Sequence, residues 1–268
     1  MLNIAHRGAR SLAPENTIAA AQKALEVGAD MWELDTGILA DGTLIIMHDD
    51  TFSRTTNVAQ QYPAKANALL HEFTWDEVQR LEAGSHFVNQ DPFGQIAAGN
   101  LGQHELDSYT KEKIPTLEQA LLFTKENHWQ VNVEIKSIRS TRKDFTIVEK
   151  TVALIQSMGM QNQVLISSFN HAYLQKASQL DASIRTGWLT AYAMRIHRSK
   201  IKKDQCQAYH PSLIGLTASK IQFFQQHGID VNVWTVNKQA DMKKMVDWNA
   251  NGIITDFPQT LQKLRKLR

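Results

Sequence analysis

The chain has 268 residues, of which 43% are hydrophobic and 21% are charged, a composition typical of a soluble globular protein with one large α/β domain or two small ones. Its formal net charge of +2 is too small to indicate a nucleic-acid partner. There is no secretory-signal pattern and no apolar run of the roughly 18 residues that a membrane span needs, and the single cysteine, Cys206, can form no internal disulfide. Together these features predict a cytoplasmic protein without stable membrane insertion.

The first part of the chain predicts a strand, a helix and a second strand. An apolar run from Leu2 to His6 leads into His6-Arg7-Gly8, and a helical spacing of apolar residues follows Pro14-Glu15-Asn16-Thr17. The next strand covers residues 31–35. Its Glu33 and Asp35 are two positions apart, so both side chains project from one face of the strand.

A hairpin follows this second strand. Asp41-Gly42 is a tight-turn signal, and the apolar residues 44–47 predict a returning antiparallel arm that ends in His48-Asp49. The hairpin therefore carries two carboxylates and an imidazole to the same end of the molecule.

Residues 51–113 interrupt the alternation of strands and helices, and we interpret them as an insertion within a single domain that covers residues 1–268. A capping box at Thr74-Trp75-Asp76-Glu77 predicts one helix here. The stretch from Ser85 to Lys113 is polar and shows no clear period. We expect the insertion to lie over one end of the fold, to select the substrate and to contribute little to the core, because such long loops are usually functional or disordered.

After the insertion, strands and helices alternate to the end of the chain. Counted with the first two strands, they make about eight βα pairs, which indicates a (β/α)8 TIM barrel carrying a small inserted subdomain after the second-strand hairpin. A doubly wound open sheet is the alternative, but no Gly-rich dinucleotide fingerprint supports it. The predicted strands are 131–136, 164–169, 184–189, 206–210, 231–236 and 252–256, and the predicted helices are 116–127, 143–158, 172–180, 218–227, 239–248 and 258–267.

Charged residues occupy positions at strand ends where a barrel is normally apolar. Glu33, Asp35 and Glu134 lie on neighbouring strands and would form an all-oxygen site that suits a hard divalent cation, Mg²⁺ or Ca²⁺. The alternative is an ion-pair network in which Arg7 and Lys136 neutralise the three acids. Spacing alone favours neither interpretation.

The sequence resembles the glycerophosphodiester phosphodiesterase family over nearly its whole length. Each motif that carries the resemblance is weak alone, but the set is specific in this order. The motifs are His6-Arg7-Gly8, Pro14-Glu15-Asn16-Thr17, Glu33-Leu34-Asp35, Asp41-Gly42, His48-Asp49, Arg54-Thr55-Thr56-Asn57, Ile114-Pro115-Thr116-Leu117, Glu134-Ile135-Lys136, Ser167-Ser168-Phe169, Trp234-Thr235-Val236-Asn237 and Thr255-Asp256.

The resemblance implies a (β/α)8 barrel that uses a divalent cation to hydrolyse a small glycerophosphodiester to an alcohol and sn-glycerol 3-phosphate. It leaves open which histidine is the base and whether the nucleophile is water or a glycerol hydroxyl. Matched motif by motif, it implies an acid–base pair of His6 and His48, metal ligands Glu33, Asp35 and Glu134, phosphate-binding cations Arg7 and Lys136, and apolar walls Phe169 and Trp234.

Two features leave the substrate and the surroundings of the protein open. Residues 86–112 match little of the family pattern, so the alcohol headgroup is not indicated, and nothing indicates an oligomeric state.

Two basic clusters are typical of solvated helix faces, although the first could approach an anionic membrane, as a lysophospholipase D would need. The clusters are Arg195, His197, Arg198, Lys200, Lys202 and Lys203, and Lys263, Arg265, Lys266 and Arg268.

Overall fold

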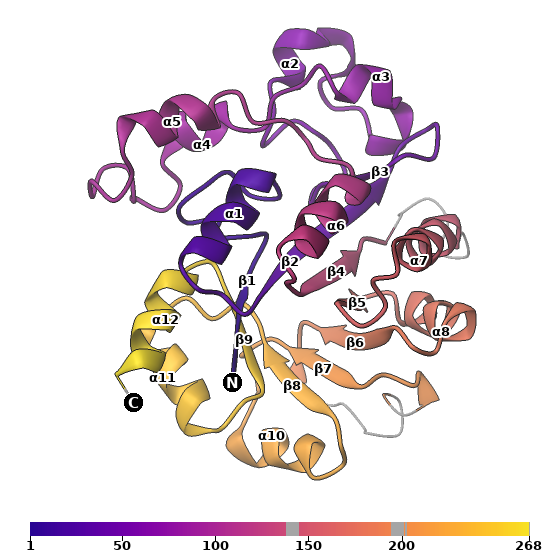
Figure 1. Cartoon of the computed structure of the whole chain (residues 1–268), viewed down its shortest axis with the longest axis vertical. Helices are drawn as coiled ribbons and strands as arrows, with labels where there is room; N and C mark the ends of the chain where they lie inside the picture. Colours follow the sequence, from indigo (N-terminus) through magenta and orange to yellow (C-terminus); the bar gives the residue numbers. More distant parts are fainter. Residues whose placement is uncertain (138–144, 194–200, 202, 268) are drawn as a thin grey trace.

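The computed structural model describes residues 1–137, 145–193, 201 and 203–267. Its strands form one sheet in the order β1-β9-β8-β7-β6-β5-β4-β2-β3, and β1 also pairs with β2. All pairings are parallel except that of β2 with β3, so the parallel strands close into a barrel (Figure 1). The strands are β1 (Leu2–Ala5), β2 (Met31–Ile38), β3 (Leu44–Ile46), β4 (Val131–Ile135), β5 (Val164–Ser168), β6 (Arg185–Thr190), β7 (Ala208–Pro211), β8 (Asp230–Val233) and β9 (Gly252–Thr255).

Helices surround this barrel and also build the segment between β3 and β4. None of the helices in the described part of the chain is both long and apolar enough to cross a membrane. They are α1 (Ile18–Glu26), α2 (Val58–Gln61), α3 (Trp75–Val78), α4 (Ser85–Gln90), α5 (Gln103–Tyr109), α6 (Leu117–Glu126), α7 (Thr146–Met158), α8 (His171–Leu180), α10 (Ala218–Gln225), α11 (Gln239–Asp247) and α12 (Pro258–Lys266), with short 3-10 turns η1 (Pro63–Lys65) and η2 (Leu70–Glu72).

The predicted TIM barrel is confirmed, including the antiparallel excursion of β3. The predicted helix from residue 143 begins at Thr146 in the structure, and residues 143 and 144 lie outside the described part of the chain. The first basic cluster also lies outside it, except for Lys203. In the second cluster, Arg265 binds Asp30 through Nη1 at 2.5 Å, which agrees with a structural role for that cation.

Alternating side chains explain how β4 brings charge into the barrel. Val131, Val133 and Ile135 are buried in the main apolar core, against the surrounding helices. The residues between them, Asn132 and Glu134, face the other way and line a cavity inside the barrel mouth. A strand of this pattern places its apolar residues outward and its polar residues toward the interior.

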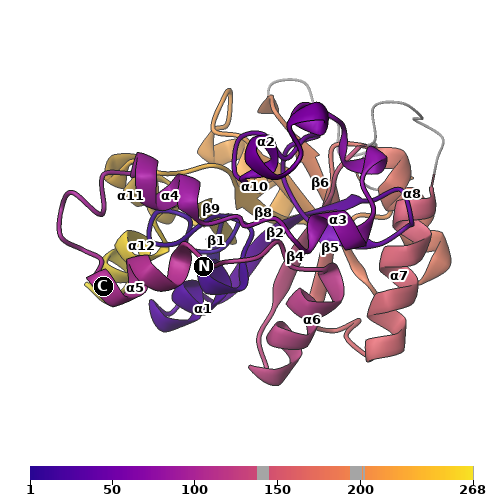
Figure 2. The same cartoon turned by 90° about the horizontal axis from the view of Figure 1, so that it is seen from above.

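The segment between β3 and α6 contains two packed parts, which Figures 1 and 2 show as separate groups. The part with α2 and α3 has an apolar cluster of its own, in which Phe52 and Phe73 pack edge to face with their ring centroids 5.0 Å apart. The part with α4 and α5 lies beside α1, where Glu105 forms an ion pair with Lys23. The limits of the insertion at residues 51 and 113 stay a prediction.

The expectation that this segment contributes little to the core is wrong for its second part. Four side chains of residues 85–109 are buried in the main core of the barrel. Three of them lie on α4 and α5, which have six and seven residues and are too short to show a periodic apolar pattern in the sequence, and the fourth lies between these helices. The four are Phe87, Leu101, Leu106 and Tyr109.

We therefore expect Phe87→Ala to lower the free energy of unfolding by about 3–5 kcal/mol, because it leaves a cavity where a ring is now 1% exposed. Urea denaturation would measure the change as a lower midpoint. Phe223→Ala is a matched control because Phe223 is 45% exposed, and it should shift stability by only about 0.5 kcal/mol. Equal effects of the two substitutions would show that α4 does not stabilise the barrel.

Candidate active site

The barrel mouth gathers charged residues from the carboxyl ends of several strands. Eight of the nine predicted site residues line one cavity there, and Asp35, the ninth, lies behind its wall with 1% exposure. The side chains that line the cavity are His6, Arg7, Glu33, His48, Asn132, Glu134, Lys136, Phe169, Leu189, Trp234, Thr235 and Ile254.

The three predicted metal ligands come together because of strand register. Asp35 on β2 stands opposite Glu134 on β4, and Glu33 lies two positions earlier on the same face of β2. One carboxylate oxygen of each residue lies within 4.8 Å of the other two. All three donors are oxygens, which is the donor set that Mg²⁺ and Ca²⁺ prefer.

The electrostatics of these acids also suit a cation. Burial raises the pKa of Glu33 well above its usual range, and repulsion by Asp35 and Glu134 raises it further. The pKa of Glu134 is raised by burial and by Asp35. Oε1 of Glu33 is buried without a hydrogen-bond partner among the described residues. An unpartnered buried carboxylate oxygen beside two other acids fits a bound divalent cation.

Two cations of the chain neutralise part of this charge. Lys136 Nζ lies 3.1 Å from Glu134 Oε1 and 3.5 Å from Asp35 Oδ1, and Arg7 Nε lies 3.3 Å from Asp35 Oδ2. Burial alone would raise the pKa of Asp35, but the charges of Lys136 and Arg7 hold it below its usual range. In the described part of the chain no Lys or Arg side chain forms an ion pair with Glu33. The ion-pair network is thus present, and Arg7 partly offsets the charge of Glu33, but neither Arg7 nor Lys136 forms an ion pair with this carboxylate.

The turn after β1 holds the acids in place. Arg7 has a left-handed backbone with φ 56°, and its N–H donates to Glu33 Oε2 at 2.9 Å. Asn16, with φ 57°, donates its side-chain amide to Asp35 Oδ2 at 2.9 Å and accepts the Asp35 N–H at 3.1 Å. Such conformations are uncommon outside glycine and persist only where the surrounding contacts maintain them.

His6 is oriented by an acid from the last strand end. Its Nδ1 lies 2.6 Å from Oδ1 of Asp256, and Nδ2 of Asn237 donates to Oδ2 of the same carboxylate at 2.7 Å. Although burial would raise the pKa of Asp256, the hydrogen bond from His6 lowers it. An ionised carboxylate can only accept, so Nδ1 of His6 carries the proton and the lone pair is on Nε2. Burial lowers the pKa of His6, which keeps the ring neutral near pH 7.

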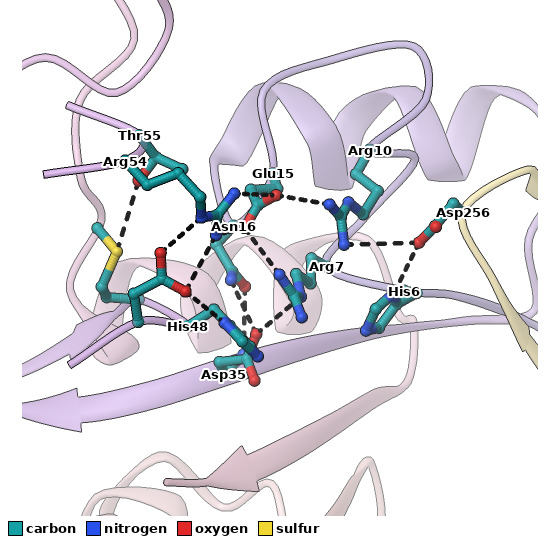
Figure 3. Close-up of polar contacts among 12 residues, drawn as sticks. His6, Arg7, Arg10, Glu15, Asn16, Asp35, His48, Arg54, Thr55 and Asp256 are labelled. Atoms are coloured by element: carbon teal, nitrogen blue, oxygen red, sulfur yellow. Dashed lines mark hydrogen bonds and ion pairs between the residues drawn. The ribbon is translucent and has the colours of Figure 1, made fainter. Parts of the chain in front are cut away.

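His48 has the same arrangement on the other side of Arg7 (Figure 3). Its Nδ1 lies 2.6 Å from Oδ1 of Asp49, the next residue in the chain. Nε of Arg54 donates to Oδ2 of Asp49 at 2.5 Å and fixes that carboxylate. Both imidazoles therefore keep Nε2 as the nitrogen that is free for proton transfer.

Two aromatic side chains form the apolar side of the cavity. Phe169, directly after β5, and Trp234, directly after β8, meet edge to face with their ring centroids 5.4 Å apart. Nε1 of Trp234 donates to the carbonyl of His210 at 2.8 Å, so its polar atom is satisfied and its rings can face an apolar group.

Sequence reasoning assigned no role to several residues that contact the predicted ones. Four of these residues lie in the family motifs, but a motif does not show which side chain each of them contacts in the fold. The four are Glu15, Asp49, Arg54 and Asp256. Asn16 binds Asp35, a contact that also cannot be read from the turn motif in which it lies.

The chain matches known proteins over nearly its full length. Residues 6–260 match the Glycerophosphoryl diester phosphodiesterase family. The chain is 32% identical over 263 residues to a glycerophosphodiester phosphodiesterase of Caldanaerobacter subterraneus subsp. tengcongensis, covering 98% of this chain and 97% of the relative. It is 30% identical over 265 residues to one of Bacillus altitudinis, with the same coverage of 98% and 97%.

Solved structures share the fold. A phosphodiesterase of Oleispira antarctica, in complex with the product sn-glycerol-3-phosphate, superposes with a TM-score of 0.83 at 24% identity, over 98% of this chain and 96% of the other. A putative glycerophosphoryl diester phosphodiesterase of Silicibacter pomeroyi gives a TM-score of 0.83 at 22% identity, over 98% and 92%.

Proposed function

The chain belongs to the glycerophosphoryl diester phosphodiesterase family and is an enzyme of that family, and we propose that it hydrolyses glycerophosphodiesters to an alcohol and sn-glycerol 3-phosphate with a divalent cation and two histidines. The observation that carries this proposal is that His6 and His48 line one cavity, each paired with a separate carboxylate, beside the cluster of three acids. The relative from Oleispira antarctica supports the proposed product, because its structure contains sn-glycerol-3-phosphate.

Glu33, Asp35 and Glu134 would hold the cation, either Mg²⁺ or Ca²⁺. When bound there, it would supply Lewis-acid stabilisation of negative charge on the phosphoryl group. Arg7 and Lys136, whose side chains reach the same cavity, would bind the phosphate and stabilise the charge that develops in the transition state. Phe169 and Trp234 would pack against the carbons of the glycerol.

The two histidines would transfer the protons. One Nε2 accepts the proton of the attacking hydroxyl, and the other imidazole, in its protonated form, delivers a proton to the oxygen of the leaving alcohol. A neutral imidazole with its proton on Nδ1 is suited to the first role, and Asp256 and Asp49 hold the Nδ1 side of each ring so that Nε2 can exchange the proton.

Product analysis tests the proposed reaction. With glycerophosphoethanolamine and either Mg²⁺ or Ca²⁺, we expect ethanolamine and sn-glycerol 3-phosphate in equal amounts. Release of glycerol and phosphoethanolamine would contradict the proposed bond cleavage. Parallel assays with glycerophosphocholine, glycerophosphoinositol and a lysophospholipid would identify the preferred headgroup, and failure to hydrolyse any of them with either metal would overturn the proposal.

A further inference from the structure

Glu15 lies at the centre of a chain of charged contacts that joins the two histidines (Figure 3). Its carboxylate binds three guanidinium groups. Oε1 lies 2.9 Å from Nη1 of Arg7 and 2.6 Å from Nη2 of Arg54, and Oε2 lies 2.9 Å from Nη2 of Arg10 and 3.1 Å from Nη1 of Arg54. Glu15 does not line the cavity and is not one of the three clustered acids.

From Glu15 the contacts divide into two arms that end on the proposed catalytic residues. In the first arm, Nη1 of Arg10 lies 3.8 Å from Oδ1 of Asp256, the oxygen that binds His6. In the second arm, Nη2 of Arg54 lies 3.2 Å from Oδ1 of Asp49, the oxygen that binds His48. Each arginine therefore approaches the very atom on which its histidine depends.

The charges show what Glu15 does in this arrangement. Burial alone would raise its pKa, but the hydrogen bond from Arg54 and the charges of Arg7 and Arg10 lower it to about 2, so the carboxylate is ionised at neutral pH. Without that charge, the ion pairs of Arg10 and Arg54 would be with Asp256 and Asp49 alone. Both guanidinium groups would then be free to turn further onto the carboxylate oxygens that bind the histidines, and would compete with the imidazoles more strongly than they do now.

We propose that Glu15 is a positioning residue for both His6 and His48. It fixes the orientation of Arg10 and Arg54, so that Oδ1 of Asp256 and Oδ1 of Asp49 keep their 2.6 Å hydrogen bonds to the Nδ1 atoms of the imidazoles although a guanidinium group approaches each carboxylate. This inference rests on the proposed two-histidine function, and it explains why the Pro14-Glu15-Asn16-Thr17 turn, which lies outside the barrel strands, belongs to the active site.

Glu15→Gln tests the proposal, because glutamine keeps the size of the side chain and removes its charge. We expect kcat to fall roughly 10- to 100-fold, the loss that is usual when a residue that orients a ligand is removed. KM should change much less, because Arg7 keeps its contact with Asp35 and its N–H bond to Glu33. Glu15→Asp retains the charge and should recover part of the lost kcat.

Proton NMR of the substrate-free protein supplies a readout that does not depend on activity. In the unmodified protein, the two Nδ1 protons should give far-downfield signals, as expected for short hydrogen bonds to carboxylates. Both signals should move upfield or disappear in Glu15→Gln. Arg10→Gln should affect only the His6 signal, and Arg54→Gln should affect only the His48 signal.

A folded Glu15→Gln variant with both ring signals in place and wild-type kcat would overturn the positioning role. If Glu15→Gln does not fold, the two arginine variants decide, and the proposal fails if neither changes the signal of its own histidine. Failure of the proposed two-histidine function would give a different result, because His6→Ala and His48→Ala would then keep their activity regardless of the ring signals.

Discussion

Replacing His6 or His48 with alanine is expected to lower kcat roughly 10²- to 10⁴-fold, the range typical of a lost general acid or base. Each ring lines the cavity and has its Nδ1 bound to a carboxylate, which leaves Nε2 for proton transfer. No other histidine in the described part of the chain lines the cavity, so none could replace the lost proton donor or acceptor. Steady-state kinetics with glycerophosphoethanolamine at saturating metal would measure the loss.

The double variant distinguishes a joint mechanism from two independent effects. In the proposed mechanism the two imidazoles act in one reaction, so removing both should lower kcat by less than the product of the single losses. His104→Ala is a suitable control because this histidine is exposed on α5 and does not line the cavity, so its loss should leave kcat unchanged. A single variant that retains more than about a tenth of the wild-type kcat would remove that histidine from the mechanism.

Removal of divalent cations is expected to abolish activity, and added Mg²⁺ or Ca²⁺ should restore it. The structural reason is the cluster of Glu33, Asp35 and Glu134, whose mutual repulsion a cation would relieve. The cation should also stabilise the fold, since it binds the folded state only. At a concentration 100 times its Kd, the gain is about 2.7 kcal/mol, which a thermal unfolding series would detect as a higher Tm.

Glu134→Gln should weaken metal binding because it removes one of the three negative charges. A titration of activity against metal concentration should therefore shift to higher concentrations, while Glu118→Gln, an exposed acid in the first turn of α6, should leave the titration unchanged. Full activity of Glu134→Gln after exhaustive chelation would contradict the metal site.

Spacing along single strands predicted much of the barrel mouth. The two-residue interval between Glu33 and Asp35 places both on one face of β2, and the alternation in β4 turns Glu134 inward. Such relations depend only on strand geometry, which is the same in every sheet. The aromatic pair of Phe169 and Trp234 was predicted by family resemblance, and its edge-to-face contact appears only in the structure.

The orienting residues could not be predicted because their partners are set by tertiary structure. Asp256 reaches His6 only because β9 lies beside β1, and the sequence contains many other acids that could have taken this role. Glu15 reaches Arg54 across 39 positions of the chain, through a turn with a left-handed residue beside it. Burial, not spacing, makes these contacts strong, and burial is a property of the folded chain.

The pairing of β1 with β9 also determines when His6 can first meet its carboxylate during synthesis of the chain. His6 and Asp256 are separated by 250 residues, so His6 leaves the ribosome long before its partner. At roughly 5–20 residues per second, this interval is on the order of tens of seconds. Throughout that time β1 has one unpaired edge, which is a site for aggregation unless a chaperone covers it. A message that ends before β9 would therefore yield an open sheet whose His6 lacks its carboxylate.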